Sequence, residues 1–159
     1  VGIDPGLVDT GVVQYLINSA TKQIDLAPLV ITRQPAIEIA RQVLTLSPMK
    51  NPNRFVFVEA YRPRQHFNTD ARMMGLVKDV AHECGGRAIP NTGVKKVVKP
   101  ALLGLMQSQQ FALSTNHDDV VSAARIALLG MMKNPDLNTL LSDIVRDYID
   151  GSEWDVRIV

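Results

Sequence analysis

An apolar run at residues 54–60, RFVFVEA, ends in a carboxylate, Glu59. Its side chains are apolar on both faces of an extended strand, which is typical of a central strand with helices on both sides of the sheet. Segments with a helical spacing of apolar residues flank it at 36–46 and 68–84. The chain is therefore predicted to be an α/β protein, and the charge that ends its most apolar strand requires an explanation.

The order of the segments predicts a mixed sheet. Strands are predicted at residues 1–4, 11–18, 23–32, 54–60 and 87–91, and helices at residues 36–46, 68–84, 94–106, 118–132 and 137–149. Pro5-Gly6 and a turn at residues 20–22 separate the first three strands, which should form an antiparallel meander. Pro28 makes the third an edge or bulged strand, and Pro100 interrupts the helical pattern around it. We expect five strands in all, with helices on both faces of the sheet.

Composition and length limit the kind of protein. Hydrophobic residues make up 46% and charged residues 21% of the 159 residues, as in globular proteins. We expect one domain over residues 1–159, ending in a tail at 151–159 whose Trp154 either packs back on the domain or serves a partner. The sequence has neither an apolar run of 18 residues nor a secretory signal pattern, which predicts a cytoplasmic protein without a membrane segment. The single cysteine, Cys84, is predicted to be a reduced core thiol.

Charge is unevenly distributed along the chain. Residues 61–113 carry eight basic and three acidic side chains, whereas residues 114–159 carry four basic and eight acidic ones. A basic block of this kind is either a solvated face or a surface that binds a polyanion.

Acidic residues stand at three places that an α/β sheet can bring together. Asp4 ends the first strand, Glu59 ends the fourth, and the pair Asp118 and Asp119 begins a long helix. Neighbouring strand ends lie about 5 Å apart, and a helix can begin at the same edge. Carboxylates that converge repel one another unless a cation joins them, and Mg²⁺ or Mn²⁺ binds through such oxygens. Two ions held in this way could promote hydrolysis of a phosphodiester.

Each acid also has a structural interpretation. Asp4 is consistent with a turn residue that caps its own backbone, and Asp118 or Asp119 with a helix N-cap. Glu59 could pair with a nearby arginine instead of a metal ion.

Five segments, taken in order, resemble the motifs of one nuclease family. They are GIDPGLVDTGVV (2–13), VFVEAY (56–61), FNTDARMMG (67–75), IPNTGVKKVV (89–98) and NHDDVVSAARIAL (116–128). In order and spacing they are similar to RuvC-type Holliday-junction resolvases, over most of residues 2–130. The looseness of the match to the cellular pattern favours a bacteriophage version.

The resemblance implies an RNase H-like fold and a crossover junction endodeoxyribonuclease of DNA recombination and repair. Such an enzyme would use Mg²⁺ or Mn²⁺, as two ions, and no small-molecule cofactor. Its partner would be branched DNA, in which a homodimer would make two paired cuts. The helix at 68–84 would then lie near the dimer interface.

Carried over to this chain, Asp4 and Glu59 take the first two metal-ligand and catalytic roles. The third is irregular, because the family usually has an acid or His three residues before a final Asp, whereas here either Asn116 precedes Asp119 or Asp119 precedes Ser122.

Helix periodicity helps to choose between the adjacent acids. Asp119 shares its face with small and apolar residues that suit packing on the sheet, so it is the preferred ligand. Asp118 remains a helix-start charge or a second ligand and catalytic acid. His117 is a candidate for orienting water.

The candidates for DNA contacts follow Glu59 and the fifth strand. They are Arg62, Arg64, Phe67, Arg72, Lys95 and Lys96. The basic ones would neutralise phosphates beside the cut, and Lys95 or Lys96 resembles a family lysine near the scissile phosphate. Phe67, expected in a polar loop, is a candidate for stacking on an unpaired base. A solvated lysine pair and a phenylalanine in the core are the structural alternatives.

Other functions fit parts of the pattern. The same fold could cut flaps, RNA–DNA hybrids or packaging DNA, and a non-catalytic module could bind branched DNA as a scaffold. Sugar kinases and actin-like ATPases begin with a similar strand, but they need two such domains and further glycine-rich phosphate loops, which do not fit this length and sequence. The retained acids Asp4, Glu59 and Asp119 favour a nuclease over a scaffold.

Overall fold

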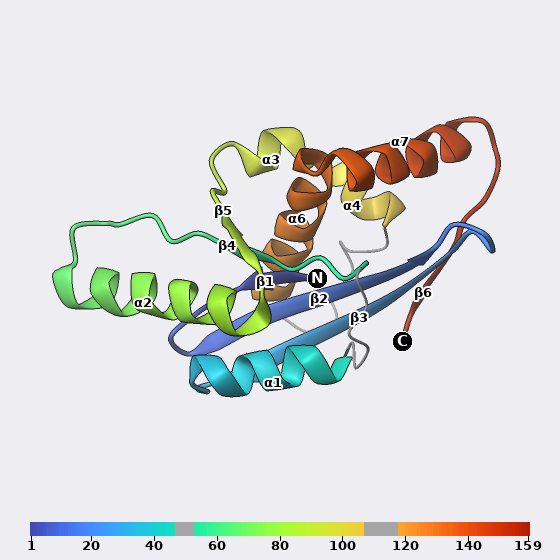
Figure 1. Cartoon of the computed structure of the whole chain (residues 1–159). Coiled ribbons are helices and arrows are strands. Elements are labelled where there is room, and N and C mark those ends of the chain that lie inside the picture. The colour runs from blue at the N-terminus through green and yellow to red at the C-terminus, as the bar shows by residue number, and fades with distance from the viewer. Residues whose placement is uncertain (47–52, 107–117) are drawn as a thin grey trace.

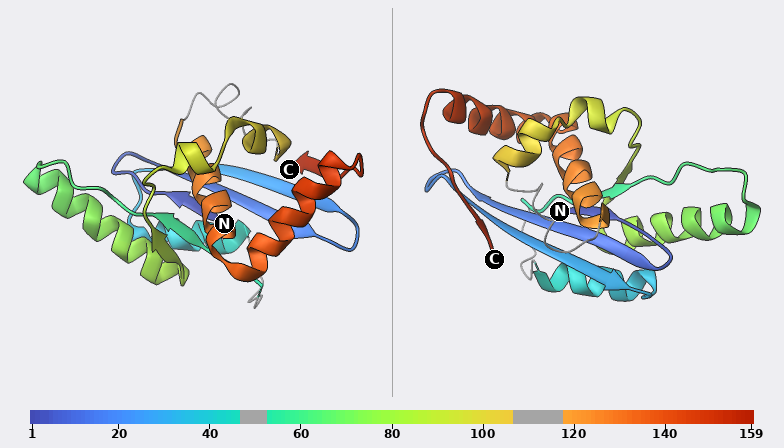
Figure 2. Two further views of the ribbon diagram at one scale, coloured as in Figure 1. Left: turned by 90° about the horizontal axis from the view of Figure 1, so that it is seen from above. Right: turned by 180° about the vertical axis from the view of Figure 1, so that it is seen from behind.

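The computed structural model describes residues 1–46, 53–106 and 118–159, so Asn116 and His117 lie outside the described residues. These residues form one six-stranded sheet with helices on both faces (Figures 1 and 2), which confirms the predicted α/β class. The strands are β1 (Gly2–Asp4), β2 (Asp9–Asn18), β3 (Gln23–Thr32), β4 (Phe57–Glu59), β5 (Arg87–Ile89) and β6 (Asp155–Ile158). The helices are α1 (Ala36–Leu46), α2 (Phe67–Cys84), α3 (Val94–Val97), α4 (Pro100–Leu105), α6 (Asp118–Lys133) and α7 (Pro135–Ile149).

The order of strands in the sheet is β5-β4-β1-β2-β3-β6. The parallel strands β1, β4 and β5 all end at the same side of the sheet. β1 pairs antiparallel with β2, and β2 with β3, which confirms the predicted meander. β4 lies parallel to β1, with Ile3 opposite Val58, and β5 lies parallel to β4. This register places Asp4 and Glu59 at neighbouring positions, where β1 and β4 end.

The helices form two layers that bury different sides of the same strands. α1 and α2 cover one face, to which Ile3, Val12 and Val58 contribute buried side chains. α6 and α7 cover the other face, to which Val13 and Phe57 contribute. Phe57 and Val58 are adjacent in β4 and belong to opposite cores, because successive strand residues point to opposite faces. This explains why the run is apolar on both faces.

Two glycines let α6 lie very close to β1 and β2. A Cβ atom at Gly2 would be 2.0 Å from the backbone oxygen of Ala123, and one at Gly11 would be 2.2 Å from that of Asp119. Any larger residue at either position would collide with the helix backbone, which cannot yield as a flexible side chain does. The first turns of α6 are therefore fixed over the strand end that carries the first acid.

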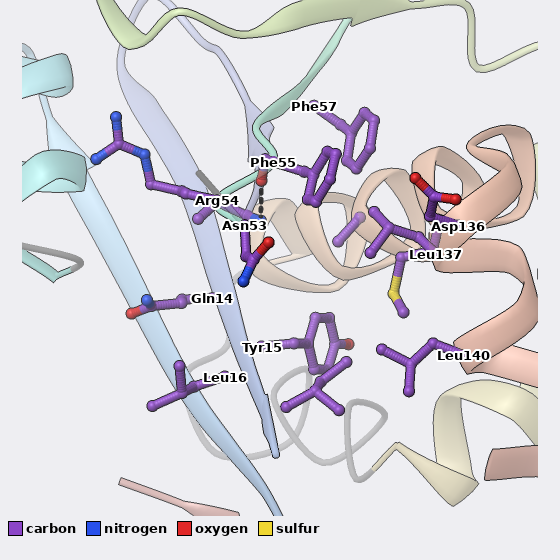
Figure 3. Close-up of a pocket in the computed structure, with 14 residues that line it drawn as sticks. Gln14, Tyr15, Leu16, Asn53, Arg54, Phe55, Phe57, Asp136, Leu137 and Leu140 are labelled. Atoms are coloured by element: carbon purple, nitrogen blue, oxygen red, sulfur yellow. Dashed lines mark hydrogen bonds between the residues drawn. The ribbon is translucent and has the colours of Figure 1, made fainter. Parts of the chain in front are cut away.

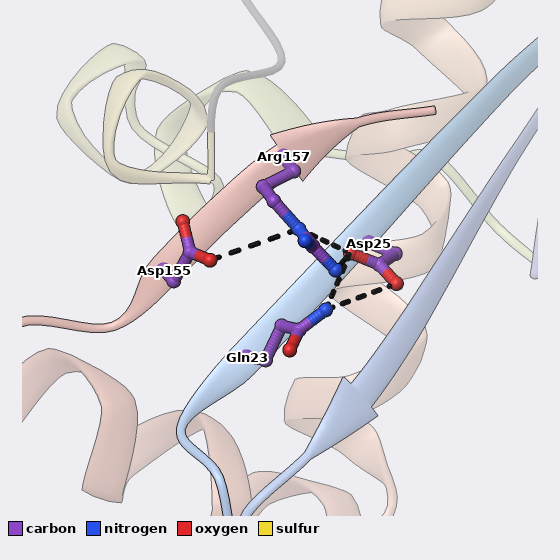
Figure 4. Close-up of polar contacts among 4 residues, drawn as sticks. All are labelled: Gln23, Asp25, Asp155 and Arg157. Carbon is purple, nitrogen blue, oxygen red and sulfur yellow. Dashed lines mark hydrogen bonds and ion pairs between the residues drawn. The ribbon is translucent and has the colours of Figure 1, made fainter.

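The predicted count of five strands is wrong, because part of the predicted C-terminal tail forms β6. β6 pairs parallel with residues 23–26 of β3. Nε and Nη2 of Arg157 both lie 3.0 Å from Oδ1 of Asp25 (Figure 4). A strand of four residues is too short for its alternation to be recognised in the sequence. β3 lies between β2 and β6 and is not an edge strand as a whole, but Pro28 lies beyond the part of β3 that β6 covers in the described chain, where the strand has a free edge.

Trp154, just before β6, packs back on the domain. It contacts the core on the α7 side of the sheet, and its Nε1 donates a hydrogen bond of 3.0 Å to Oδ2 of Asp147. Lys22 Nζ lies 3.3 Å from the same oxygen. The aromatic ring thus connects the end of α7 to the start of β6.

Trp154→Ala is expected to lower the free energy of unfolding by about 2 kcal/mol, because it removes a half-buried aromatic side chain and its hydrogen bond. Arg157→Gln should cost less than about 1 kcal/mol, because the Arg157 side chain is half exposed and its ion pair is partly screened by solvent. Urea unfolding of both variants measures the difference. Equal losses would mean that the ion pair holds β6 in place as strongly as Trp154 does.

Several boundaries differ from the prediction. β4 begins at Phe57 instead of residue 54, because its partners β1 and β5 have only three residues each. α2 begins at Phe67, so this residue lies in a helix and not in a loop, with 91% of its surface exposed. Pro100 separates α3 from α4, in agreement with the predicted interruption.

Cys84 is buried at the end of α2, as predicted for a core thiol. Burial raises the pKa of its thiol to about 11. Within the described ranges, none of the helices combines the length and the apolar character needed to span a bilayer.

Candidate active site

Asp4 and Glu59 interact directly at the ends of β1 and β4. Their carboxyl groups are close enough that Glu59 raises the pKa of Asp4. Burial, then the charge and hydrogen bond of Glu59, and then the charge of Asp119 raise the pKa of Asp4 to about 9. These influences all act in the same direction. Such a set of acids favours the binding of a cation.

Asp119 is the third acid of this set, and its position in α6 distinguishes it from Asp118. Asp119 is half-buried and close enough to raise the pKa of Asp4, whereas Asp118 is exposed. The contact of its backbone with Gly11 holds Asp119 against the sheet. Of the two adjacent acids, Asp119 is therefore the one that lies near Asp4, at the edge of the sheet where β1 and β4 end.

The turn that follows Asp4 is fixed by Thr10, which is only 1% exposed. Its hydroxyl accepts a hydrogen bond from Gly6 N at 3.2 Å and donates one to Gly6 O at 3.4 Å. At the start of β2, Asp9 Oδ1 accepts a hydrogen bond of 2.9 Å from the Thr32 hydroxyl. The first acid is therefore held between a buried strand and a closed turn.

Asn91 is a site residue that the sequence analysis missed. It lies two residues after β5, and its Nδ2 donates a hydrogen bond to Oε1 of Glu59. An amide donor favours the charged form of a carboxylate and fixes its orientation. The sequence gives no direct signal for this role, because only the pairing of β5 with β4 makes Asn91 a neighbour of Glu59.

A cavity of about 430 Å³ opens beside these carboxylates and is called the carboxylate cavity below. Asp4, Glu59 and Asn91 line one part of it, and Arg62 and Arg64 line another. Both arginines belong to residues 60–66, the loop between β4 and α2. The structure thus brings positive side chains to the rim of the acidic centre.

The other predicted DNA-contact residues are not among the residues that line the cavity. Phe67 and Arg72 are exposed on α2. Lys95 and Lys96 are exposed on α3, which begins three residues after Asn91.

The carboxylates of Asp4, Glu59 and Asp119 are the kind of ligand that binds a hard divalent cation. Carboxylate oxygens are the ligands that Mg²⁺ and Mn²⁺ prefer, and a cation would relieve the repulsion that raises the pKa of Asp4. As the side chains stand, no three His, Cys, Asp or Glu residues of the described chain form a ready metal-binding group. Because the pKa of Asp4 is raised, a cation that binds there competes with a proton.

A second cavity, of about 400 Å³, lies between the sheet and α7 (Figure 3). Its lining is largely apolar and includes Tyr15, Phe55 and Leu137, while Asp136 is the one acid among its described lining residues. A single carboxylate offers no basis for metal-assisted hydrolysis. The carboxylate cavity is therefore the candidate active site.

No protein-family model and no curated protein matches the chain. Among solved structures, it is similar to RuvC of T. thermophilus in complex with a Holliday junction substrate. The identity is 22% and the TM-score 0.51, over 80% of this chain and 88% of that one. The chain has the RuvC fold. A second Thermus thermophilus RuvC structure matches at 21% identity with a TM-score of 0.44, over 80% of this chain and 89% of that one.

Asp4→Asn is expected to raise the melting temperature of the metal-free protein by several degrees at neutral pH. The substitution removes a carboxyl group that burial and its neighbours disfavour in the charged form. Mg²⁺ should raise the melting temperature of the wild type and have little effect on the variant. Thermal scans with and without Mg²⁺ test this, with Asp79→Asn on the exposed face of α2 as a control. A variant less stable than the metal-free wild type would contradict the prediction.

Proposed function

We infer that the protein is a metal-dependent endonuclease that resolves four-way DNA junctions by making two paired cuts in each. The observation that supports this most is the convergence of Asp4, Glu59 and Asp119 at one edge of a sheet with the RuvC fold. The T. thermophilus RuvC structure contains a Holliday junction substrate, which makes branched DNA the first substrate to test.

The chemistry follows from the groups around the carboxylate cavity. Divalent ions bound by the three carboxylates would supply an activated water and neutralise charge that develops on the phosphate. Asn91 keeps the carboxylate of Glu59 oriented through its amide. Arg62 and Arg64 are placed to bind phosphates on either side of the cut, which gives affinity with little sequence information.

Paired cuts require two active sites related by a two-fold axis, so the functional form is a homodimer. α2 is the candidate for the interface, because its N-terminal half projects beyond the sheet (Figure 1). Met74 on this helix is 53% exposed. Phe67 at its start would be available to stack on an unpaired base at the branch point.

Cleavage of a synthetic four-way junction, a flap and a linear duplex in Mg²⁺ tests the proposal. We expect the junction to be cut at two symmetric positions and faster than the flap, with the duplex left intact. Preferential cutting of the flap would keep the nuclease activity and change the substrate. Binding without cutting in either Mg²⁺ or Mn²⁺ would favour the scaffold function.

A further inference from the structure

One carboxylate, Asp70, holds the 60–66 loop in place. It lies in the first turns of α2 and is only 8% exposed. Its Oδ1 accepts hydrogen bonds from the Tyr61 hydroxyl at 2.7 Å and from Arg64 N at 3.1 Å. Its Oδ2 accepts one from His66 N at 3.0 Å. The loop is thus tied to one side chain near its start, in its middle and at its end.

The backbone of this loop is strained between two of those bonds. Gln65 has φ 64°, in the left-handed region that side chains other than glycine, asparagine and aspartate rarely adopt. It stands between Arg64 and His66, whose N–H groups both donate to Asp70. A strained residue persists only where its surroundings impose the conformation, and strain of this kind is common at functional sites. The bonds on both sides of Gln65 supply that constraint.

The strained conformation matters because Arg62 and Arg64 reach the carboxylate cavity from this loop. We propose that Asp70 is a positioning residue, which holds the loop so that both arginines stand beside Glu59 and bind the DNA backbone there. Hydrogen bonds, above all the one from Tyr61, lower the pKa of Asp70, so it remains a charged acceptor at neutral pH. The DNA ligand rests on the proposed function, whereas the loop contacts do not.

Asp70→Asn is the first test, because an amide cannot accept all three donors. We expect affinity for a four-way junction, measured in Ca²⁺, to fall roughly tenfold, and the slope of log affinity against log salt to fall by up to about two, as two phosphate contacts are lost. The double variant Arg62→Gln, Arg64→Gln should show the same change. Asp79→Asn, an exposed acid on the same helix, should bind like the wild type.

The coupling between these variants distinguishes positioning from a general loss of structure. Because Asp70 acts through the two arginines, adding Asp70→Asn to the arginine double variant should cause little further loss of affinity. Gln65→Gly should restore part of the affinity of Asp70→Asn, since glycine adopts a positive φ without strain. An additive loss in the triple variant, or a fall in affinity with an unchanged salt slope, would overturn the proposal.

Hydrogen exchange of the DNA-free protein gives a readout independent of nuclease activity. The amides of Arg64 and His66 should exchange slowly in the wild type and much faster in Asp70→Asn, while the amides of β2 keep their protection. Unchanged exchange would refute the positioning role even if the protein cuts junctions. Faster exchange in a protein that binds no branched DNA would refute the proposed function and the DNA role, and would leave Asp70 as a loop anchor only.

Discussion

Glu59→Gln should abolish junction cleavage while leaving junction binding in Ca²⁺ within a few-fold of the wild type. The substitution keeps the size of the side chain and an oxygen that can accept the hydrogen bond from Asn91, but removes the charge that the proposed metal ions require. Loss of such a ligand removes about 4 kcal/mol of transition-state stabilisation, or roughly a thousandfold in rate. Single-turnover cleavage in Mg²⁺ measures the rate, and titration in Ca²⁺ measures the affinity.

The matched control for this substitution is Glu83→Gln, an exposed acid near the end of α2. It makes the same chemical change away from the carboxylate cavity, so its cleavage rate should equal that of the wild type. Cleavage by Glu59→Gln at the wild-type rate would remove this residue from the mechanism. Loss of binding as well as cleavage would show that the substitution acts on folding or on DNA contacts.

Gly11→Ala should have the next largest effect, although it changes no charged group. The added Cβ would lie 2.2 Å from the backbone oxygen of Asp119, so α6 must move away from β2. Such overpacking costs about 1–3 kcal/mol of folding stability. A displacement of Asp119 by about 1 Å would also reduce the cleavage rate by roughly a hundredfold. Chemical denaturation and single-turnover cleavage measure the two losses separately.

Gly75→Ala provides the opposite case for comparison. A Cβ at Gly75 meets nothing within 4 Å, and the residue lies inside α2. Alanine there should stabilise the protein by up to about 1 kcal/mol and leave the packing of α6 on the sheet unchanged. If Gly11→Ala behaved in the same way, close packing of α6 would not be what positions Asp119.

The sequence was most informative where a pattern follows from the geometry of the sheet. Apolar residues on both faces of residues 54–60 correctly predicted a strand covered on both sides, and Phe57 and Val58 indeed belong to opposite cores. The parallel register of β1 and β4 makes neighbours of two acids that are 55 residues apart in the chain. The position of Asp119 beside them follows from helix periodicity and from glycines that face the helix.

Other features depend on contacts that no local pattern encodes. β6 is four residues long and pairs with a strand 132 positions earlier, as its Arg157–Asp25 contact shows. Asn91 matters because β5 lies next to β4, a relation that only the tertiary structure reveals. In the sequence alone, Asp70 cannot be distinguished from an ordinary acid at the start of a helix. Its role depends on the path of the preceding loop, which donates hydrogen bonds to it.

The burial of Cys84 has a practical consequence for experiments. Only the thiolate reacts with alkylating dyes, and a thiol with a pKa of about 11 is almost entirely protonated at neutral pH. A cysteine introduced at an exposed position such as Ser152 would therefore be labelled selectively without removal of the native residue. Mixing chains that carry donor and acceptor fluorophores would then report self-association by energy transfer, before and after junction DNA is added.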